Sequence, residues 1–144
     1  MGRLDLRRKA PQVDPWHVIL VDTSTIVAWL DQSHPDHKTA SQALVTVLME
    51  DDVAVSVVTL AELAVGGRTR EALEADLKGM IVIEVTAADA WRAGQVFARL
   101  PRKHATPLPD FFIRAQAAER GWRHLTNDRR RLGWWPDLEF VFGN

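Results

Sequence analysis

Four acidic side chains stand where predicted strands give way to helices. Asp22 ends the first apolar run and Glu62 lies early in a predicted helix. Asp110 opens a later helix, and Asp128 follows a later strand. Carboxylates a few ångströms apart repel one another, which favours binding of a cation. Mg²⁺ and Mn²⁺ prefer carboxylate and water oxygens, and such ions can activate water for phosphodiester hydrolysis. The four acids therefore predict a Mg²⁺ or Mn²⁺ site with hydrolytic chemistry.

Each acid also has a purely structural interpretation. Asp22 and Asp128 could cap the N-termini of helices. Glu62 follows Thr59 in the spacing of a T-x-x-E capping box, and Asp110 could complement a helix dipole. These interpretations explain why helices start, but not why so much negative charge converges on one crevice. A capping carboxylate can still present its other oxygen to a metal, so the two interpretations are compatible.

The elements that carry these acids alternate between strand and helix, which predicts an α/β fold. Compact β-branched runs such as 53–57 are typical of strands buried on both faces of a parallel sheet. The predicted strands are 17–21, 53–57, 80–85, 122–126 and 138–142. The predicted helices include 26–30, start at 35 and 59, and cover 69–78, 86–100 and 109–120.

Right-handed crossovers between such strands place helices on both faces of a parallel sheet. In open sheets of this kind, ligands bind beyond the carboxyl ends of the strands. Because the acids follow or adjoin those ends, we expect them to line one crevice.

Length and composition indicate a single ordinary domain. The chain has 144 residues, of which 47% are hydrophobic and 26% are charged. The absence of cysteine excludes disulfides and thiolate metal sites and fits a reducing cytoplasm. No apolar run approaches the roughly 20 residues that a membrane span needs, so no membrane association is expected.

Regular patterning begins only at His17. The preceding segment, 1–16, carries four basic residues but no apolar stretch of the kind found in secretory signals. The sequence therefore predicts an N-terminal extension over 1–16, either flexible or added during cloning, and a domain over 17–144.

Charge is unevenly distributed along the chain. Residues 50–90 hold nine acids and three bases, whereas residues 91–131 hold ten bases and three acids. A cationic half around isolated carboxylates suits a polyanionic substrate such as RNA. The candidate RNA-binding residues are Arg102, Lys103, His104, Arg129 and Arg130. His34, His37 and His124 show no convincing metal-ligand spacing and are assigned no role.

Six tryptophans include two adjacent ones near the C-terminus. Trp134 and Trp135 could stack on RNA bases, but packing in the core or a dimer is the favoured role of Trp135. Trp29, Trp91 and Trp122 fall inside helix and strand patterns, so burial in the core or against a partner is expected.

Four sequence blocks, each containing one of the acids, resemble the acidic motifs of PIN-domain nucleases. The blocks are ILVDTS at 19–24, VTLAEL at 58–63, PDFFI at 109–113 and LTNDRR at 125–130. Their order is that of the family, and the version is similar to the VapC toxins of bacterial toxin–antitoxin pairs. The longer N-terminal segment and the aromatic C-terminal tail depart from the family pattern.

The resemblance implies a three-layer α/β/α fold with a central parallel sheet in the order 3-2-1-4-5. It implies that Asp22, Glu62 and Asp110 are the main catalytic metal ligands and that Asp128 completes the site. The small polar residues Ser24 and Thr126 match positions of the family that orient these acids. The resemblance therefore assigns a role to six residues.

Similar proteins are cytoplasmic endoribonucleases that depend on Mg²⁺ or Mn²⁺. They usually form homodimers, and an antitoxin of the VapB type silences them. Two other functions stay open. One is a catalytically silent PIN-fold module that binds RNA or a partner. The other is a phosphatase with Asp22 as nucleophile, although such enzymes typically carry a second Asp where this chain has Ser24.

Overall fold

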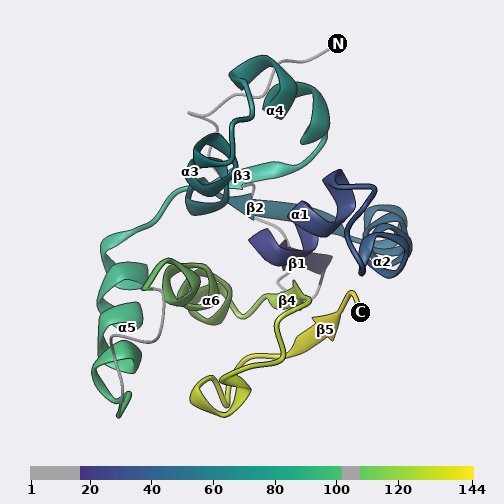
Figure 1. The fold of residues 1–144 in the computed structure, drawn as a ribbon. Coiled ribbons are helices and arrows are strands. Elements are labelled where there is room, and N and C mark those ends of the chain that lie inside the picture. The colour runs from purple at the N-terminus through teal and green to yellow at the C-terminus, as the bar shows by residue number, and fades with distance from the viewer. Residues whose placement is uncertain (1–16, 102–107) are drawn as a thin grey trace.

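Strands and helices alternate through the part of the chain that the computed structural model describes, residues 17–101 and 108–144 (Figure 1). The predicted extension 1–16 and three of the candidate RNA-binding residues, Arg102, Lys103 and His104, lie outside the described residues. In chain order the elements are β1 (Val18–Val21), α1 (Thr23–Leu30), α2 (His37–Glu50), β2 (Asp52–Ser56), α3 (Val57–Val65), α4 (Arg70–Asp76), β3 (Ile81–Ile83), α5 (Ala87–Ala98), α6 (Leu108–Arg120), β4 (Arg123–Thr126), the 3₁₀ helix η3 (Leu132–Trp134) and β5 (Phe140–Phe142).

The five strands form one sheet in the order β3-β2-β1-β4-β5, and every neighbouring pair is parallel. The central strand, β1, is fully buried along its length. Its last residue, Val21, pairs with Val55 of β2 and Leu125 of β4. The chain segments that follow β1, β2 and β4 therefore leave the same edge of the sheet. The predicted α/β class and strand order are confirmed.

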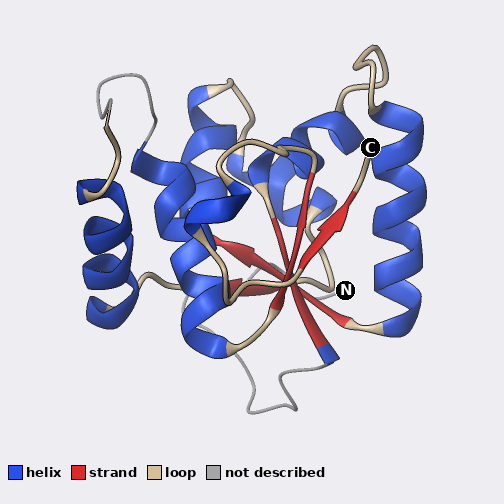
Figure 2. Ribbon diagram, turned by 90° about the horizontal axis from the view of Figure 1, so that it is seen from below, coloured by secondary structure: helices blue, strands red, loops and turns tan. Residues whose placement is uncertain are grey.

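Helices cover both sides of the sheet, so the layers are α/β/α (Figure 2). Leu20 of β1 and Ile113 of α6 belong to the core under α5 and α6. Ile19 of β1 belongs to the opposite core, together with Ile26 of α1 and Leu44 of α2. Adjacent residues of β1 point to opposite faces, which explains why this strand is apolar at every position.

The start of α3 differs from the sequence prediction. Ser56, not Thr59, caps this helix, and the Ser56 hydroxyl oxygen accepts a hydrogen bond from the Val58 N–H at 3.0 Å. Thr59 lies inside the first turn and is fully buried. The capping-box interpretation of Glu62 is therefore wrong, which leaves its carboxylate available for another role.

One tryptophan that was expected to be buried is exposed. Trp91 on α5 is 72% exposed. Trp122 and Trp135 are buried, as predicted. Within residues 17–101 and 108–144, no helix is both long and apolar enough to cross a membrane.

Candidate active site

Asp22 occupies the centre of the carboxyl edge of the sheet, between the end of β1 and the start of α1. It caps α1, and its Oδ1 accepts a hydrogen bond from the Thr23 N–H at 2.8 Å. Its Oδ2 accepts a hydrogen bond of 2.7 Å from the Thr126 hydroxyl and a longer one, 3.4 Å, from Ser24. Asp22 is 4% exposed. The predicted capping role is confirmed, and the same contacts fix the direction in which the carboxylate points.

Thr23 links the first acid to the second. Its hydroxyl donates a 2.9 Å hydrogen bond to Glu62 Oε1. Because that hydroxyl has only one proton, the 2.9 Å bond between the Thr23 and Thr59 hydroxyls must be donated by Thr59. A buried threonine on α3 therefore orients a threonine on α1, which in turn holds Glu62. No local sequence pattern predicts this pair of hydrogen bonds.

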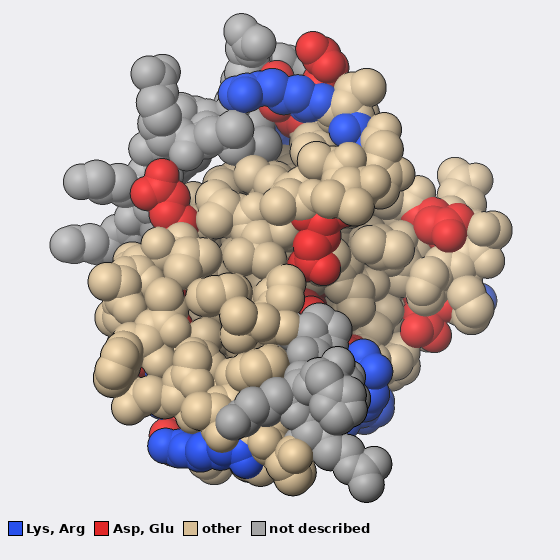
Figure 3. Space-filling view, turned by 60° about the vertical axis from the view of Figure 1, so that its left-hand side comes forward, with Lys and Arg blue, Asp and Glu red and all other residues tan. Residues whose placement is uncertain are grey.

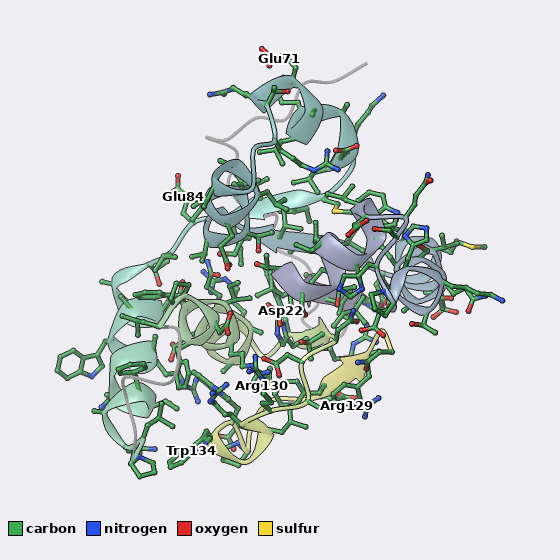
Figure 4. The ribbon with its side chains drawn as sticks, viewed as in Figure 1. Asp22, Glu71, Glu84, Arg129, Arg130 and Trp134 are labelled. Atoms are coloured by element: carbon green, nitrogen blue, oxygen red, sulfur yellow. The ribbon has the colours of Figure 1, made fainter. Side chains whose placement is uncertain are left out.

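Asp110 and Asp128 complete the acidic surface from two further elements. Asp110 stands in the first turn of α6, and Asp128 follows β4. Together with Asp22 and Glu62 they line one open groove of about 470 Å³. In Figure 4, Arg130 lies between Asp22 and Trp134, and it lines the same groove. The structure thus brings all four predicted acids to one groove.

The capping interpretation of Asp128 is wrong. The helix that follows it, η3, has Arg131 at its N-cap position and no side-chain cap. Asp128 instead forms a tight turn in which its Oδ1 accepts a hydrogen bond from the Arg130 N–H at 2.9 Å. The Asp128 N–H donates to the Thr126 hydroxyl oxygen at 2.9 Å, so Thr126 joins the first acid to the fourth.

The acids repel one another. Burial raises the pKa of Asp110 to about 6, and the charges of Asp22, Glu62 and Asp128 reinforce the shift. The pKa of Glu62 is also raised, first by burial and then by Asp22, against a hydrogen bond from Thr23. Uncompensated negative charge of this kind is typical of groups that bind a cation.

Two buried basic residues, Arg114 and His124, lie behind the acids. Neither was predicted from the sequence to belong to the site. Burial alone would raise the pKa of Asp22, but His124, the Thr126 hydrogen bond and the charge of Arg114 together lower it to about 2. The protein therefore favours the ionised form of Asp22 and disfavours that of Asp110.

Arg114 lies one helical turn after Asp110 on α6 and is 4% exposed. Its guanidinium donates hydrogen bonds to the backbone carbonyls of Asp128, at 3.1 Å, and Arg130, at 2.9 Å. It also lies over the ring of Phe140, 5.2 Å from its centre. Arg114 thus supplies positive charge near the acids and fixes the backbone that carries Asp128.

His124 on β4 is fully buried directly behind Asp22. Its Nδ1 lies 3.0 Å from the carbonyl oxygen of Leu20, which can only accept, so Nδ1 carries the proton. Its Nε2 is 3.8 Å from Asp22 Oδ2, which is too far for a direct hydrogen bond. The effect of His124 on that carboxylate is therefore electrostatic.

The donor set fits a hard divalent cation, because it consists of carboxylates with hydroxyl groups behind them. Among residues 17–101 and 108–144, however, no three Asp, Glu or His side chains lie close enough to hold one ion as they stand. A shared ion would require at least one carboxylate to move toward the others. Asp128 is the acid whose two oxygens are both paired with a cationic side chain, that of Arg130.

Several basic residues of the predicted cationic surface pair with acidic residues of the same chain. Arg92, Arg120 and Arg123 pair with Glu119, Asp89 and Asp51, respectively. Figure 3 shows Asp and Glu both near the middle of the drawn face and toward its edges, while Lys and Arg lie mainly toward the edges.

The two candidate RNA-binding arginines that the structure describes differ in their contacts. Arg130 lines the groove. Arg129 instead donates hydrogen bonds to Asn144 and lies over the ring of Phe142, 3.8 Å from its centre. Among the residues described, the geometry therefore favours Arg130 over Arg129 as a contact for a ligand in the groove.

Replacing Asp110 with Asn should stabilise the metal-free protein at pH 7.5 by about 1 kcal/mol, allowing for the partial exposure of the group. The pKa of Asp110 is raised to about 6 from 3.8, so the folded state binds the proton more tightly than the unfolded chain does. Its ionisation therefore costs stability as the pH rises through this interval. The gain should vanish near pH 4, where the wild-type side chain is protonated, as urea unfolding in EDTA would measure.

Asp89 provides a matched control, because it occupies the same third position of α5 that Asp110 occupies in α6. Its carboxylate pairs with Arg120 and accepts the Thr86 N–H. Asp89→Asn should therefore destabilise the protein under the same conditions. Equal effects of the two substitutions would contradict the assignment of repulsion to the acidic groove.

Comparisons with known proteins agree with this architecture. The family model of the PIN domain matches residues 19–133. No match is found among curated proteins. VapBC2 from Rickettsia felis, solved bound to a DNA fragment from its promoter, is similar over 87% of this chain and 98% of that chain, with a TM-score of 0.68 and 20% identity.

Two further solved structures share the fold. A toxin–antitoxin complex from Klebsiella pneumoniae is similar over 88% of this chain and 98% of that chain, with a TM-score of 0.67 and 20% identity. VapC20 from Mycobacterium tuberculosis, described as a toxin that cleaves the sarcin–ricin loop, is similar over 74% of this chain and 86% of that chain, with a TM-score of 0.60 and 23% identity.

Proposed function

Because this chain belongs to the PIN domain family, we propose that it is a Mg²⁺- or Mn²⁺-dependent endoribonuclease that acts as the toxin of a toxin–antitoxin pair. The observation that carries this proposal is the convergence of Asp22, Glu62, Asp110 and Asp128 on one groove at the carboxyl edge of the sheet. The raised pKa of Asp110 adds support, since burial and then the charges of the other three acids disfavour its ionised form in the absence of a cation.

The chain's own residues would divide the work. Asp22 supplies a carboxylate of fixed orientation, because Thr23 and Thr126 hold its two oxygens. Glu62 and Asp110 supply carboxylates that are held by fewer hydrogen bonds than Asp22, so their oxygens can move toward an ion. Ser24 supports the arrangement through a hydrogen bond that it accepts from the Asn127 N–H at 3.2 Å. A divalent ion bound among them would lower the pKa of a bound water and neutralise charge on the phosphodiester.

The remaining parts of the proposal concern the environment of the site. The neighbours in fold are solved as toxin–antitoxin assemblies, which supports a VapB-like antitoxin as partner of this chain. VapC20 is described as a toxin that cleaves the sarcin–ricin loop, which supports RNA as the substrate class. A homodimer and a cytoplasmic location complete the proposal. Arg130 is the described basic residue best placed to contact RNA in the groove.

The direct test is cleavage of structured RNA by the purified chain. We expect fragments in Mg²⁺ or Mn²⁺ and none in EDTA, with activity restored when the metal is returned. The ends of the fragments should map to defined positions, as an endonuclease requires. Cleavage that continues in EDTA at the same rate would contradict the metal assignment.

A cellular test addresses the toxin role separately. Expression of the wild-type chain should arrest growth, and Asp110→Asn should relieve the arrest because it removes one of the four carboxylates. Both proteins must accumulate equally. Arrest that persists with Asp110→Asn, at equal protein level, would contradict a toxin role based on this site.

One observation favours a second candidate, a catalytically silent module that binds RNA or a partner. In the described part of the chain, no three acids are close enough to share an ion without moving. A silent module predicts no saturable Mn²⁺ binding to the wild-type chain. Saturable binding that Asp22→Asn removes would exclude this candidate.

A further inference from the structure

Asp128 differs from the other three acids because an arginine of the same loop engages both of its carboxylate oxygens. Arg130 Nε lies 2.9 Å from Oδ1, and a terminal nitrogen lies 3.1 Å from Oδ2. The Arg130 backbone N–H also donates to Oδ1 at 2.9 Å. This two-pronged geometry is the one in which a guanidinium matches a carboxylate best. As it stands, Asp128 already has a cation, and that cation is part of the chain.

The turn that carries this pair is fixed independently of it. Arg114 holds the carbonyls of Asp128 and Arg130 from the buried side, and Thr126 accepts the Asp128 N–H. The backbone therefore does not depend on the side-chain pair. Arg130 could release the carboxylate by rotating its side chain alone.

The Arg130 side chain is well placed to leave. It is 68% exposed, whereas that of Asp128 is 15% exposed, and both residues line the groove. Exposed ion pairs are weak, because water solvates the separated charges almost as well. A phosphate offers a guanidinium the same two-pronged partner as a carboxylate does. A phosphate entering the groove can therefore compete with Asp128 for Arg130.

We propose that Arg130 guards Asp128 in the free protein and transfers to a phosphate of bound RNA, which frees Asp128 to complete the metal site. This inference rests on the proposed function and deepens it, because it makes binding of RNA and of the divalent ion mutually supportive. By linkage, RNA tightens metal binding by the same factor by which the metal tightens RNA binding. The site is then fully assembled only when its substrate is present.

The test compares the Mn²⁺ affinity of the wild type with that of two variants. The affinity is measured by calorimetric titration of the full chain without RNA. Arg130→Gln should tighten Mn²⁺ binding about three- to tenfold, since Asp128 loses its competing cation. Arg129→Gln is the matched control, because it removes the same charge from the neighbouring position, where the side chain bonds to Asn144 rather than Asp128. A comparable gain in Arg129→Gln would show a general charge effect and overturn the proposal.

A double-substitution cycle isolates the pair. In an Asp128→Asn background, Arg130→Gln should no longer change Mn²⁺ affinity, because the contested carboxylate is absent. In the wild type, a single-stranded 2′-O-methyl RNA, checked for integrity afterwards, should tighten Mn²⁺ binding by a similar three- to tenfold. This gain should be lost in Arg130→Gln, which should also bind the RNA less tightly.

Failure of this inference can be told apart from failure of the proposed function. If Mn²⁺ binds the wild type and RNA is cleaved, but Arg130→Gln leaves Mn²⁺ affinity unchanged or weaker, only the guarding role is overturned. If neither the wild type nor Arg130→Gln binds Mn²⁺, both the guarding role and the metal-dependent function are overturned. Urea unfolding of each variant confirms that the comparison is made on folded protein.

Discussion

Asp22→Asn should reduce RNA cleavage by at least about 100-fold and abolish saturable Mn²⁺ binding, while the chain stays folded. Changing a residue that only supports a metal ligand typically costs 10–100-fold, so loss of the central carboxylate should cost more. Asn retains one oxygen, which can cap α1 through the Thr23 N–H, while its amide NH₂ can donate to the Thr126 hydroxyl oxygen in place of the lost Oδ2. The substitution therefore removes charge more than structure, and a cleavage assay alongside calorimetry measures both effects.

The control for this prediction is Asp31→Asn at the other end of α1. Asp31 is exposed, and its carboxylate bonds only to Ser33 among the contacts described for it. It should leave cleavage and Mn²⁺ binding unchanged. If Asp22→Asn retained more than a tenth of wild-type cleavage, the groove would not be the reactive site.

The same substitution should also alter the acid stability of the protein. The pKa of Asp22 is lowered to about 2 from 3.8, so the ionised carboxylate stabilises the folded state above pH 4. That contribution is lost as the pH falls from about 4 toward 2. Asp22→Asn should therefore lower stability near neutral pH and flatten its dependence on pH in this acid range.

The position of the acids could be predicted because it follows from chain direction alone. In a parallel sheet, every strand delivers its next residue to the same edge, so Asp22 and Asp128 meet once β1 and β4 are neighbours. Strand patterns and turn residues were enough to predict where each acid falls. The order of the strands came from the resemblance to PIN domains, because β1 and β4 are far apart along the chain.

The groups that tune the acids could not be predicted in the same way. Arg114 and His124 act through contacts between α6, β4 and β1, which no local pattern encodes. One signal was present: a charged residue follows the apolar segment 111–113, one turn after Asp110, on a helix that must bury that face. A buried charge needs partners, and the four acidic blocks were the nearest candidates.

Local rules also failed where tertiary contacts outweighed them. Thr59 has the spacing of a helix cap, but Ser56 reaches the helix first and leaves Thr59 to bond with Thr23. Clustered arginines suggested a cationic surface, yet several pair with acids distant in sequence. Trp91 fits a helix pattern but lies on its exposed face. Sequence spacing shows which residues share a face, but not what covers that face.

The largest effect on stability should come from Arg114→Met, which we expect to lower the free energy of unfolding by about 2–4 kcal/mol at pH 7.5. The substitution keeps most of the side-chain volume but removes two hydrogen bonds to the carbonyls of Asp128 and Arg130. It also removes a buried positive charge that acts on Asp22, Asp110 and Asp128. Urea unfolding in EDTA measures the loss, which exposed Arg99→Met at the end of α5 should not reproduce.

Two further measurements separate the charge of Arg114 from its hydrogen bonds. Arg114→Lys keeps the charge but has no planar group that could reach both carbonyls. Its free energy of unfolding should therefore lie between those of the wild type and Arg114→Met. The loss in Arg114→Met should shrink from pH 7.5 to pH 5, because Asp110, with its pKa raised to about 6, takes up a proton and leaves less negative charge to compensate. A loss equal at both pH values would assign Arg114 to backbone support alone, whereas wild-type stability in Arg114→Met would contradict its role altogether. The acidic groove therefore holds together in the absence of metal because a buried guanidinium occupies part of the role that a bound cation would have.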